Sequence, residues 1–590
     1  MLLSVVFTLA LSGGQAILPV HAEQFVAHAE TRLGELALAV NRASWVANTY
    51  ITVDTQAIAA DANEAFIAEA VRLAKEAGRF DGVAVPQELR RKLQLLRTIL
   101  PAPAPSDPEK TAEVARLAAK LEAAYGEAKA CDAAGKCRDI QEITRVFTSS
   151  RDPKELLAAW TAWHAIGRPM RGDYERFAAL MNEGARELGY ADTGALWRST
   201  YDMTPAQLAS EVDRLWAQAK PLYDALHCHV RAKLAEKYGR STVDPRQPIP
   251  AHLLGNIWAQ DWSNVYDLVA PGNASAGYDL TKIIEQKQLG PKEMVRIGEG
   301  FFTSLGFDPL PQTFWERSML TKPRDREVVC HASASDVDDK DDLRIKMCIE
   351  PTAEDFKVIH HELGHNFYQR AYKNQTFLHR DSAHDGFHEA IGDTIALSVT
   401  PAYLRQLGLL DASSPEPDEV ATLLRDALEH VAFIPFGIVV DRWRWQVFSG
   451  ETKPADYNKA WWELRGRYQG VAAPVARTET DFDPGAKFHI PGNTSYTRYF
   501  LARFLEFQLH RDLCRIAGNT GPLHRCTIYG NAEAGAHLRA FLEAGRSRPW
   551  PDTLETLGGG REMDATAMLD YFAPLKKWLD EQNKGRQCGW

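Results

Sequence analysis

Residues 358–369, VIHHELGHNFYQ, combine three histidines with a glutamate. Within this stretch, His361, Glu362 and His365 fit the pattern HExxH. An α-helix turns about 100° per residue, so residues four apart share a face, and two imidazoles placed in this way can bind one zinc ion. The glutamate between them is not a ligand but can take a proton from a metal-bound water. The pattern therefore predicts a metal-dependent hydrolytic site.

A hydrolytic zinc site needs a third protein ligand and one open position. Downstream, the segment GFHEAIGDTIALSV places Glu389 and Asp393 four residues apart in an apolar helical run. A buried carboxylate needs a partner or a metal. We therefore predict that Glu389 is the third ligand and that Asp393 forms a hydrogen bond with a ligand imidazole.

Other histidines near these segments are weaker candidates for metal ligands. His384 and His388 are also four residues apart, but the Asp-Gly dipeptide between them indicates a turn. A common helical face, and with it a metal role for this pair, is therefore disfavoured. His360 points away from the face of the two HExxH histidines and is expected to be structural.

The elements that must position these residues are mostly helical. Apolar residues recur at helical spacing over residues 66–78, 111–130, 205–237, 418–431 and 496–517. The one clear strand candidate is the segment 326–334, which is β-branched in its middle. No flexible low-complexity linker divides the chain. We expect a mainly α-helical protein that folds as one large, two-lobed unit.

Composition and charge disfavour some classes of function. Hydrophobic residues make up 45% and charged residues 25% of the 590 residues, which is an ordinary globular balance. The net charge of -10 and the lack of a run rich in lysine and arginine disfavour a nucleic-acid partner.

The N-terminus predicts export. The apolar run at residues 2–11 is too short to span a bilayer, and small residues precede a cleavage position after Ala22. We predict a signal peptide over residues 1–22, although a basic residue near Met1 is missing. No later run is long and apolar enough for a membrane helix. The product is expected to be secreted or periplasmic, without a membrane anchor.

The eight cysteines agree with an oxidising compartment. Cys131 and Cys137 enclose a short loop, and a turn-rich loop lies between Cys514 and Cys526. These spacings favour local pairs, although the sequence alone does not determine connectivity. No CxxC spacing indicates a cysteine-based zinc site. Cys228 and Cys588 would be left over by local pairing.

At this point the chain resembles a known family. HHELGH followed by GFHEAIGDTIALSV is similar to the angiotensin-converting-enzyme family of zinc peptidyl-dipeptidases, and further similar segments follow one another in order. They include SWVANTYIT, ALWRSTYD, IPAHLLGNIWAQDWSNVYDLV, FFTSLGF, REVVCHASA, AFIPFGIVVDRWRW, RTETDFDPGAKFHIP and GPLHRCTIYG. The resemblance implies a single catalytic domain over residues 23–590, nearly all helical, with a deep cleft and short strands near the zinc.

The resemblance also implies roles for individual residues. It makes His361, His365 and Glu389 the zinc ligands and Glu362 the general base. Tyr499 matches the residue that stabilises the tetrahedral intermediate, and an imidazole such as His489 can also donate to the oxyanion. Further implied roles are substrate binding by His331, Ala332 and His489, and capture of the substrate's C-terminal carboxylate by Gln260, Lys487 and Tyr496. The implied disulfides are Cys131–Cys137, Cys330–Cys348 and Cys514–Cys526.

The carboxylate-binding trio indicates the reaction subtype. An amide, a lysine and a phenol placed two residues beyond the scissile bond favour release of C-terminal dipeptides from short peptides with a free C-terminus. The carboxypeptidase branch of the family changes the glutamine position, whereas Gln260 is retained here. The alternatives are a single-residue carboxypeptidase, a general oligopeptidase, or a non-catalytic peptide-binding protein.

The family also has chloride sites lined by arginine and aromatic residues. Tyr201 and Arg498 match one of them. Trp461 and Arg465 match part of the other, but its remaining arginine falls on His164. A neutral histidine binds an anion less well than a permanently charged guanidinium. We therefore expect this second set to be weakened, and chloride to act as an activator at Tyr201 and Arg498.

Overall fold

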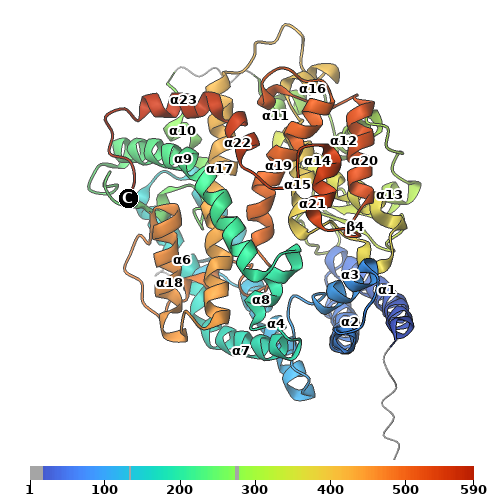
Figure 1. The fold of residues 1–590 in the computed structure, drawn as a ribbon. Helices are drawn as coiled ribbons and strands as arrows, with labels where there is room; N and C mark the ends of the chain where they lie inside the picture. The colour runs from blue at the N-terminus through green and yellow to red at the C-terminus, as the bar shows by residue number, and fades with distance from the viewer. Residues whose placement is uncertain (1–17, 132–134, 273–277) are drawn as a thin grey trace, which may run out of the picture.

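The computed structural model describes residues 18–131, 135–272 and 278–590. This part of the chain is mostly helical, with a few short strands (Figure 1), which confirms the expected mainly α-helical class. Most of the predicted signal peptide lies outside the described residues, and its last residues belong to the first helix. Cleavage of the signal peptide after Ala22 and the division of the protein into two lobes stay predictions. No helix in the described ranges is long and apolar enough to cross a membrane.

The first three helices have a small hydrophobic core of their own and lie together at one edge of the molecule (Figure 1, blue). This core includes Val26, Leu33, Leu73 and Leu93. The three helices, called here the N-terminal unit, are α1 (Pro19–Thr49), α2 (Val53–Ala77) and α3 (Gln87–Arg97).

The other helices share a second, much larger core. They are α4 (Pro108–Gly126), α5 (Ile140–Ser149), α6 (Pro153–His164), α7 (Arg171–Glu187), α8 (Thr193–Arg198), α9 (Pro205–Tyr238), α10 (Tyr266–Val269), α11 (Leu280–Gln286), α12 (Pro291–Ser304), α13 (Gln312–Arg317), α14 (Ala353–Ala371), α15 (Asp385–Leu397), α16 (Pro401–Gln406), α17 (Glu419–Ser449), α18 (Tyr457–Leu464), α19 (Thr497–Ile516), α20 (Ala532–Glu543), α21 (Trp550–Leu554), α22 (Thr566–Tyr571) and α23 (Ala573–Gln582).

The long helix α17 runs through the middle of this body and packs against α9 and α19 (Figure 1). The Asp418 side chain caps its start by accepting a hydrogen bond from the Ala421 amide. It ends at Gly450, whose φ of 75° suits glycine. The helix therefore extends well beyond the predicted segment 418–431, with Pro435 inside it. The predicted helices 205–237 and 496–517 match α9 and α19 closely.

The strands form three two-stranded sheets in the described residues. These pairs are β1 (Ala130–Cys131) with β2 (Cys137–Arg138), β3 (Ile249–Pro250) with β6 (Val471–Ala472), and β4 (Ser333–Asp336) with β5 (Leu343–Lys346). The strand predicted at 326–334 was wrong for most of its length, since β4 begins only at Ser333. The earlier residues bond to the end of α1 instead: the Val329 amide donates to the Asn48 carbonyl oxygen (2.8 Å).

Four disulfides close the described chain. Three are the pairs implied by the family resemblance, Cys131–Cys137, Cys330–Cys348 and Cys514–Cys526. The expectation that Cys228 and Cys588 are left over was wrong, because they bond to each other across a sequence separation of 360. Arg231 holds the same C-terminal segment by donating to the Gly589 carbonyl oxygen (2.6 Å).

Replacing both Cys228 and Cys588 with serine is expected to destabilise the protein by about 2–4 kcal/mol, because this cross-link closes a very long loop. The measurement is denaturant or thermal unfolding without reductant. The matched control is the Cys131/Cys137 double serine variant, whose loop has a sequence separation of only 6. Equal losses in the two variants would contradict the expectation.

Candidate metal centre

Helix α14 carries the HExxH residues, as predicted. Thr352 caps its start by accepting a hydrogen bond from the Asp355 amide. Its apolar face, with Phe356, Ile359 and Leu363, is fully buried. On the opposite side, the Nε2 atoms of the two HExxH histidines lie 3.0 Å apart. The helix therefore directs both imidazoles at one point.

Two glycines allow the neighbouring helix α15 to approach this face. A Cβ on Gly364 of α14 would lie 2.9 Å from the Gly392 Cα atom. A Cβ on Gly392 of α15 would lie 2.6 Å from the His361 Nδ1 atom. Any larger residue at either place would push the helices apart, because such contacts are closer than van der Waals packing permits. The close crossing places Glu389 and Asp393 beside the histidines.

The predicted ligands come together in three dimensions. One atom each of His361, His365 and Glu389 lies within 4.8 Å of the others. The Glu389 Oε2 atom is 3.8 Å from the His361 Nε2 atom. Two imidazoles and one carboxylate, with space left for a further ligand, are the donor set that zinc uses in hydrolases. These residues fit a zinc ion.

Both HExxH imidazoles have a partner behind them. The His361 Nδ1 atom lies 2.8 Å from an Asp393 oxygen, as the sequence predicted. The partner of His365 was not predicted: its Nδ1 atom lies 3.1 Å from the Nδ1 atom of His388. Tyr372 follows, with its hydroxyl 3.2 Å from the His388 Nε2 atom. If His365 binds a metal through Nε2, its Nδ1–H donates to His388, which donates from Nε2 to Tyr372.

This chain of contacts gives His388 a role that its spacing from His384 did not indicate. Burial lowers the pKa of His388 to about 4, so it is neutral near pH 7 and can accept a hydrogen bond. His384 instead caps α15, because its Nδ1 atom accepts from the Gly386 amide (3.2 Å). The predicted turn at Asp385-Gly386 was wrong, since both residues belong to the first turn of α15. His360 is structural, bonded to the Phe356 carbonyl and the Tyr403 hydroxyl.

Glu362 lies next to the ligand set with one carboxylate oxygen unsatisfied. The residue is only 7% exposed, and its Oε2 atom has no hydrogen-bond partner. Burial raises the pKa of Glu362 to about 7, while His361 opposes this shift. An orphaned carboxylate oxygen beside a metal set is suited to exchange a proton with a metal-bound molecule.

A cavity of about 890 Å³ opens beside this centre. Its wall includes His361, Glu362, and the two predicted substrate-binding residues His331 and Ala332. These two residues immediately precede β4.

A second group of predicted residues gathers around the start of α19. The ring of His489 lies 5.5 Å from that of Tyr499 and 4.7 Å from that of Tyr496. The Tyr496 hydroxyl donates to the Gln260 side-chain oxygen (3.3 Å), and the Lys487 ammonium lies 5.5 Å from the Tyr496 ring centre. The structure thus brings together the three residues predicted to bind a carboxylate.

Lys487 is the most unusual member of this group. It is 5% exposed, and in the described part of the chain its ammonium lies over aromatic rings, 4.2 Å from the Trp258 ring centre. Burial lowers the pKa of Lys487 to about 7. A buried ammonium without a carboxylate partner favours an anionic ligand.

Helix α17 holds this group in place through residues that the sequence did not reveal. The Asp441 carboxylate accepts from the Tyr496 and Thr497 amides (2.8 and 2.6 Å) and so caps α19. Arg444, bonded to Asp441, also donates to the His489 carbonyl oxygen (2.8 Å). Both side chains are buried. The sequence alone does not show which groups they contact, because those groups come from distant segments.

The comparisons with known proteins agree with this site. The Peptidase M2 family, described as angiotensin-converting enzyme, matches residues 19–590. The chain belongs to the angiotensin-converting-enzyme family. It is 47% identical to angiotensin-converting enzyme of Bos taurus over 511 residues, which cover 85% of this chain and 39% of that protein. With the enzyme of Mesocricetus auratus the identity is 44%, over 93% of this chain and 42% of the other.

Another relative is covered over more of its own length. Angiotensin-converting enzyme of Theromyzon tessulatum is 42% identical over 79% of this chain and 76% of that protein. The chain thus spans about two fifths of the length of the mammalian relatives that it matches.

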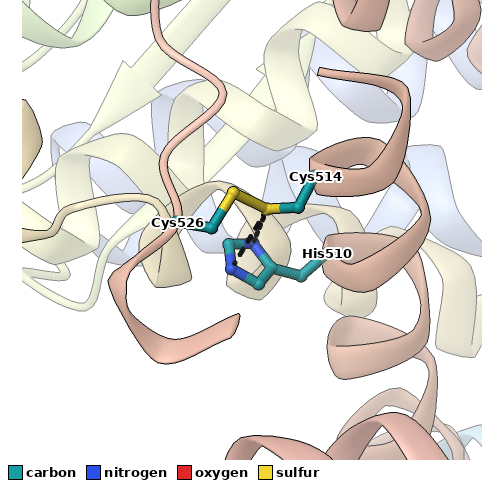
Figure 2. A group of neighbouring side chains, drawn as sticks. All are labelled: His510, Cys514 and Cys526. Carbon is teal, nitrogen blue, oxygen red and sulfur yellow. Dashed lines mark hydrogen bonds between the residues drawn. A yellow bond between two sulfur atoms is a disulfide. The ribbon is translucent and has the colours of Figure 1, made fainter. Parts of the chain in front are cut away.

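One other cluster in this family member has a metal-like composition. Figure 2 shows His510 beside Cys514 and Cys526, with the imidazole Nε2 atom 3.6 Å from the Cys514 sulfur. The two sulfurs form a disulfide. Because a thiolate is the metal ligand and a disulfide has none, this cluster is a packed cross-link.

The residues matching the family's chloride sites lie in two places. At one, the His164 ring stacks on Trp160 with centres 3.8 Å apart, and burial lowers its pKa to about 4. Arg465 is fully buried there and donates to the Trp258 carbonyl oxygen (2.7 Å); Trp461 lies beside it.

At the other place, Tyr201 is buried and its hydroxyl lies 3.5 Å from the Ser495 hydroxyl. Arg498 is paired with an aspartate that was not part of the prediction: its Nε atom is 3.1 Å from an Asp385 oxygen.

The Asp393→Asn variant is expected to bind zinc about 10–100-fold more weakly, because the amide no longer supports the charge on the ligand imidazole. Competition with a chelator measures the affinity. The control is Glu354→Gln, an exposed change on the same helix as the two histidines. An affinity equal to that of the unmodified protein would contradict the role of Asp393.

Proposed function

We propose that this family member is a zinc-dependent peptidyl-dipeptidase that releases C-terminal dipeptides from short peptides. The observation that carries the proposal is the pairing of two sites: a zinc-type donor set with an orphaned glutamate, and a buried lysine in a group suited to a carboxylate. The first suits hydrolysis, and the second suits a substrate that ends in a free carboxylate.

His361, His365 and Glu389 would hold the zinc ion, which would supply a Lewis acid for the scissile carbonyl and lower the pKa of a bound water. The chain's own residues do the rest. Glu362 accepts the proton of the attacking water at its free Oε2 atom and passes it to the leaving amine. Its buried position and raised pKa suit both transfers.

Two side chains are proposed to donate to the oxyanion. Tyr499 keeps its hydroxyl proton, because burial raises its pKa to about 12. Burial lowers the pKa of His489, so its imidazole is neutral and carries one N–H. A single donor of this kind contributes about 10²–10³-fold to the rate.

The position of the cut follows from the carboxylate group. Lys487, Gln260 and Tyr496 would hold the C-terminus of the peptide and so set the number of residues released. The resemblance favours two. A single-residue carboxypeptidase and a general oligopeptidase remain the enzymatic alternatives, and a non-catalytic peptide-binding protein the third.

Export is also a proposal, supported by the predicted signal peptide and the four disulfides. Chloride activation at Tyr201 and Arg498 stays a prediction, and the aspartate already beside Arg498 argues against it.

A blocked hexapeptide with a free C-terminus is expected to lose its last two residues as one dipeptide. Mass spectrometry of the products, with and without a chelator, decides this. Loss of one residue, or internal cuts, would refute dipeptide release.

The Glu362→Gln variant separates catalysis from binding. It is expected to keep its zinc while turnover falls by about 10²–10⁴-fold, because the proton acceptor is lost. Full activity in this variant would overturn the mechanism, and absence of turnover in the unmodified, zinc-loaded protein would favour the peptide-binding alternative.

Lys487 should make substrate capture depend on pH. Its pKa of about 7 means that it is protonated below pH 7 and loses its charge above it. We expect kcat/KM to fall as the pH rises through 7, with kcat less affected because a bound carboxylate keeps the lysine charged.

The control for this expectation is Lys487→Arg, which stays charged at every pH. Its kcat/KM should lose that alkaline limb. An identical alkaline limb in the two proteins would assign the pH dependence to another group.

A further inference from the structure

The pair Tyr201 and Arg498, which was expected to hold chloride, already has an anion of the protein beside it. An Asp385 oxygen lies 3.1 Å from the Arg498 Nε atom, and each side chain is 29% exposed. The buried Tyr201 hydroxyl is close enough to lower the pKa of the same carboxyl group. At this site, the protein itself supplies a cation (Arg498), a phenol (Tyr201) and an anion (Asp385).

We propose that Asp385 is a positioning residue whose carboxylate takes the place of chloride beside Arg498, so that this site works without added chloride. The proposal rests on the proposed peptidase function only for its activity readout. The site itself is defined by the contacts of Asp385.

Local charge supports this assignment. Burial lowers the pKa of Arg498, but Asp385 contributes most to raising it above its ordinary value. Burial raises the pKa of Asp385, and so do two further carboxylates, Asp381 and Asp441, whereas Arg498 and Tyr201 lower it. A chloride ion entering here would meet a paired guanidinium and several negative charges, which repel it.

The ion pair joins the two helices that carry the reaction. Asp385 is the first residue of α15, four residues before the predicted ligand Glu389. Arg498 lies in the first turn of α19, next to Tyr499. The backbones are close here as well, because a Cβ on Gly386 would lie 3.1 Å from the Arg498 carbonyl oxygen. The pair thus sets the distance between the metal centre and the predicted oxyanion donor.

A second ion pair does the same further along these helices. Arg503 of α19 lies 3.2 Å from an Asp393 oxygen of α15. Because ion pairs join α15 and α19 at both places, these helices have little freedom to slide past one another. Loss of the Asp385–Arg498 pair would leave Arg498 without its counter-ion and would allow Tyr499 to move.

The test compares chloride with acetate at constant ionic strength, with the zinc-loaded protein. The Asp385→Ala variant leaves room for an anion, and Asp385→Asn removes the charge but keeps the shape. Without chloride, kcat/KM of both variants should fall on the order of 10- to 100-fold, the size of effect that small displacements of a catalytic group produce. Chloride should restore the alanine variant at least about fivefold, while the unmodified enzyme changes less than about twofold at the same concentrations.

Thermal unfolding gives a readout that does not depend on activity. Chloride that binds the folded alanine variant should raise its Tm relative to acetate, whereas the unmodified protein should show no such difference. Adding Arg498→Gln to the alanine variant should abolish both the rescue and the shift in Tm. Asp267→Asn is the matched control, because this aspartate pairs with Arg151 instead (2.8 Å).

Two results would overturn the proposal. One is a chloride response of activity and of Tm that is the same in the alanine variant and the unmodified protein. The other is activation of the unmodified enzyme by chloride that disappears with Arg498→Gln. Failure of the peptidase function alone would remove the kinetic readout and leave the shifts in Tm to decide whether Asp385 occupies the anion position.

Discussion

The carboxylate of Asp393, which is 16% exposed, supports most of the site. It contacts His361 at 2.8 Å on one side and Arg503 at 3.2 Å on the other. Burial raises its pKa, but Arg503 and His361 together bring it well below its ordinary range. Because Asp393 stays ionised, it accepts a hydrogen bond from the His361 Nδ1–H group, and the Nε2 atom is the one that faces the metal site. Removal of any member would leave an unpaired buried charge, which is costly.

This constraint extends through the body of the protein. Arg503 also pairs with Glu506, which in turn contacts His430 of α17 at 2.9 Å. Helices α14, α15, α17 and α19 are therefore joined by a continuous row of charges. Two glycines, Gly364 and Gly392, permit the close helix crossing that this row requires. Packing and electrostatics are thus satisfied by the same arrangement.

Local patterns were enough to predict part of this arrangement. The HExxH helix, Glu389 and Asp393 followed from spacing, because residues four apart must share a face wherever the helix lies. The contact between His388 and His365 did not follow, because it depends on how two helices cross. The Cys228–Cys588 disulfide, with a separation of 360, was hidden for the same reason.

Two errors show where local propensity fails. The β-branched segment 326–334 was taken as a strand, but its backbone hydrogen bonds go to the end of α1. The Asp-Gly dipeptide at 385–386 was taken as a turn, but His384 caps a helix that begins there. In the first case, a partner distant in sequence satisfied the backbone groups. In the second, the helix was capped by a histidine, which is not one of the common cap residues. The fold class depended on neither, because helical periodicity along the chain decided it.

The separate core of the N-terminal unit has a consequence for motion. Its three helices bury their apolar faces mainly against one another, so moving them as a unit exposes little of the main core. Polar contacts join it to the body, such as the ion pair of Arg91 with Asp202 at 2.6 Å. A hollow of about 270 Å³ already separates α1 from β4. The seam between the N-terminal unit and the body therefore lies beside β4, and its opening would break few apolar contacts, so it would require less free energy than global unfolding.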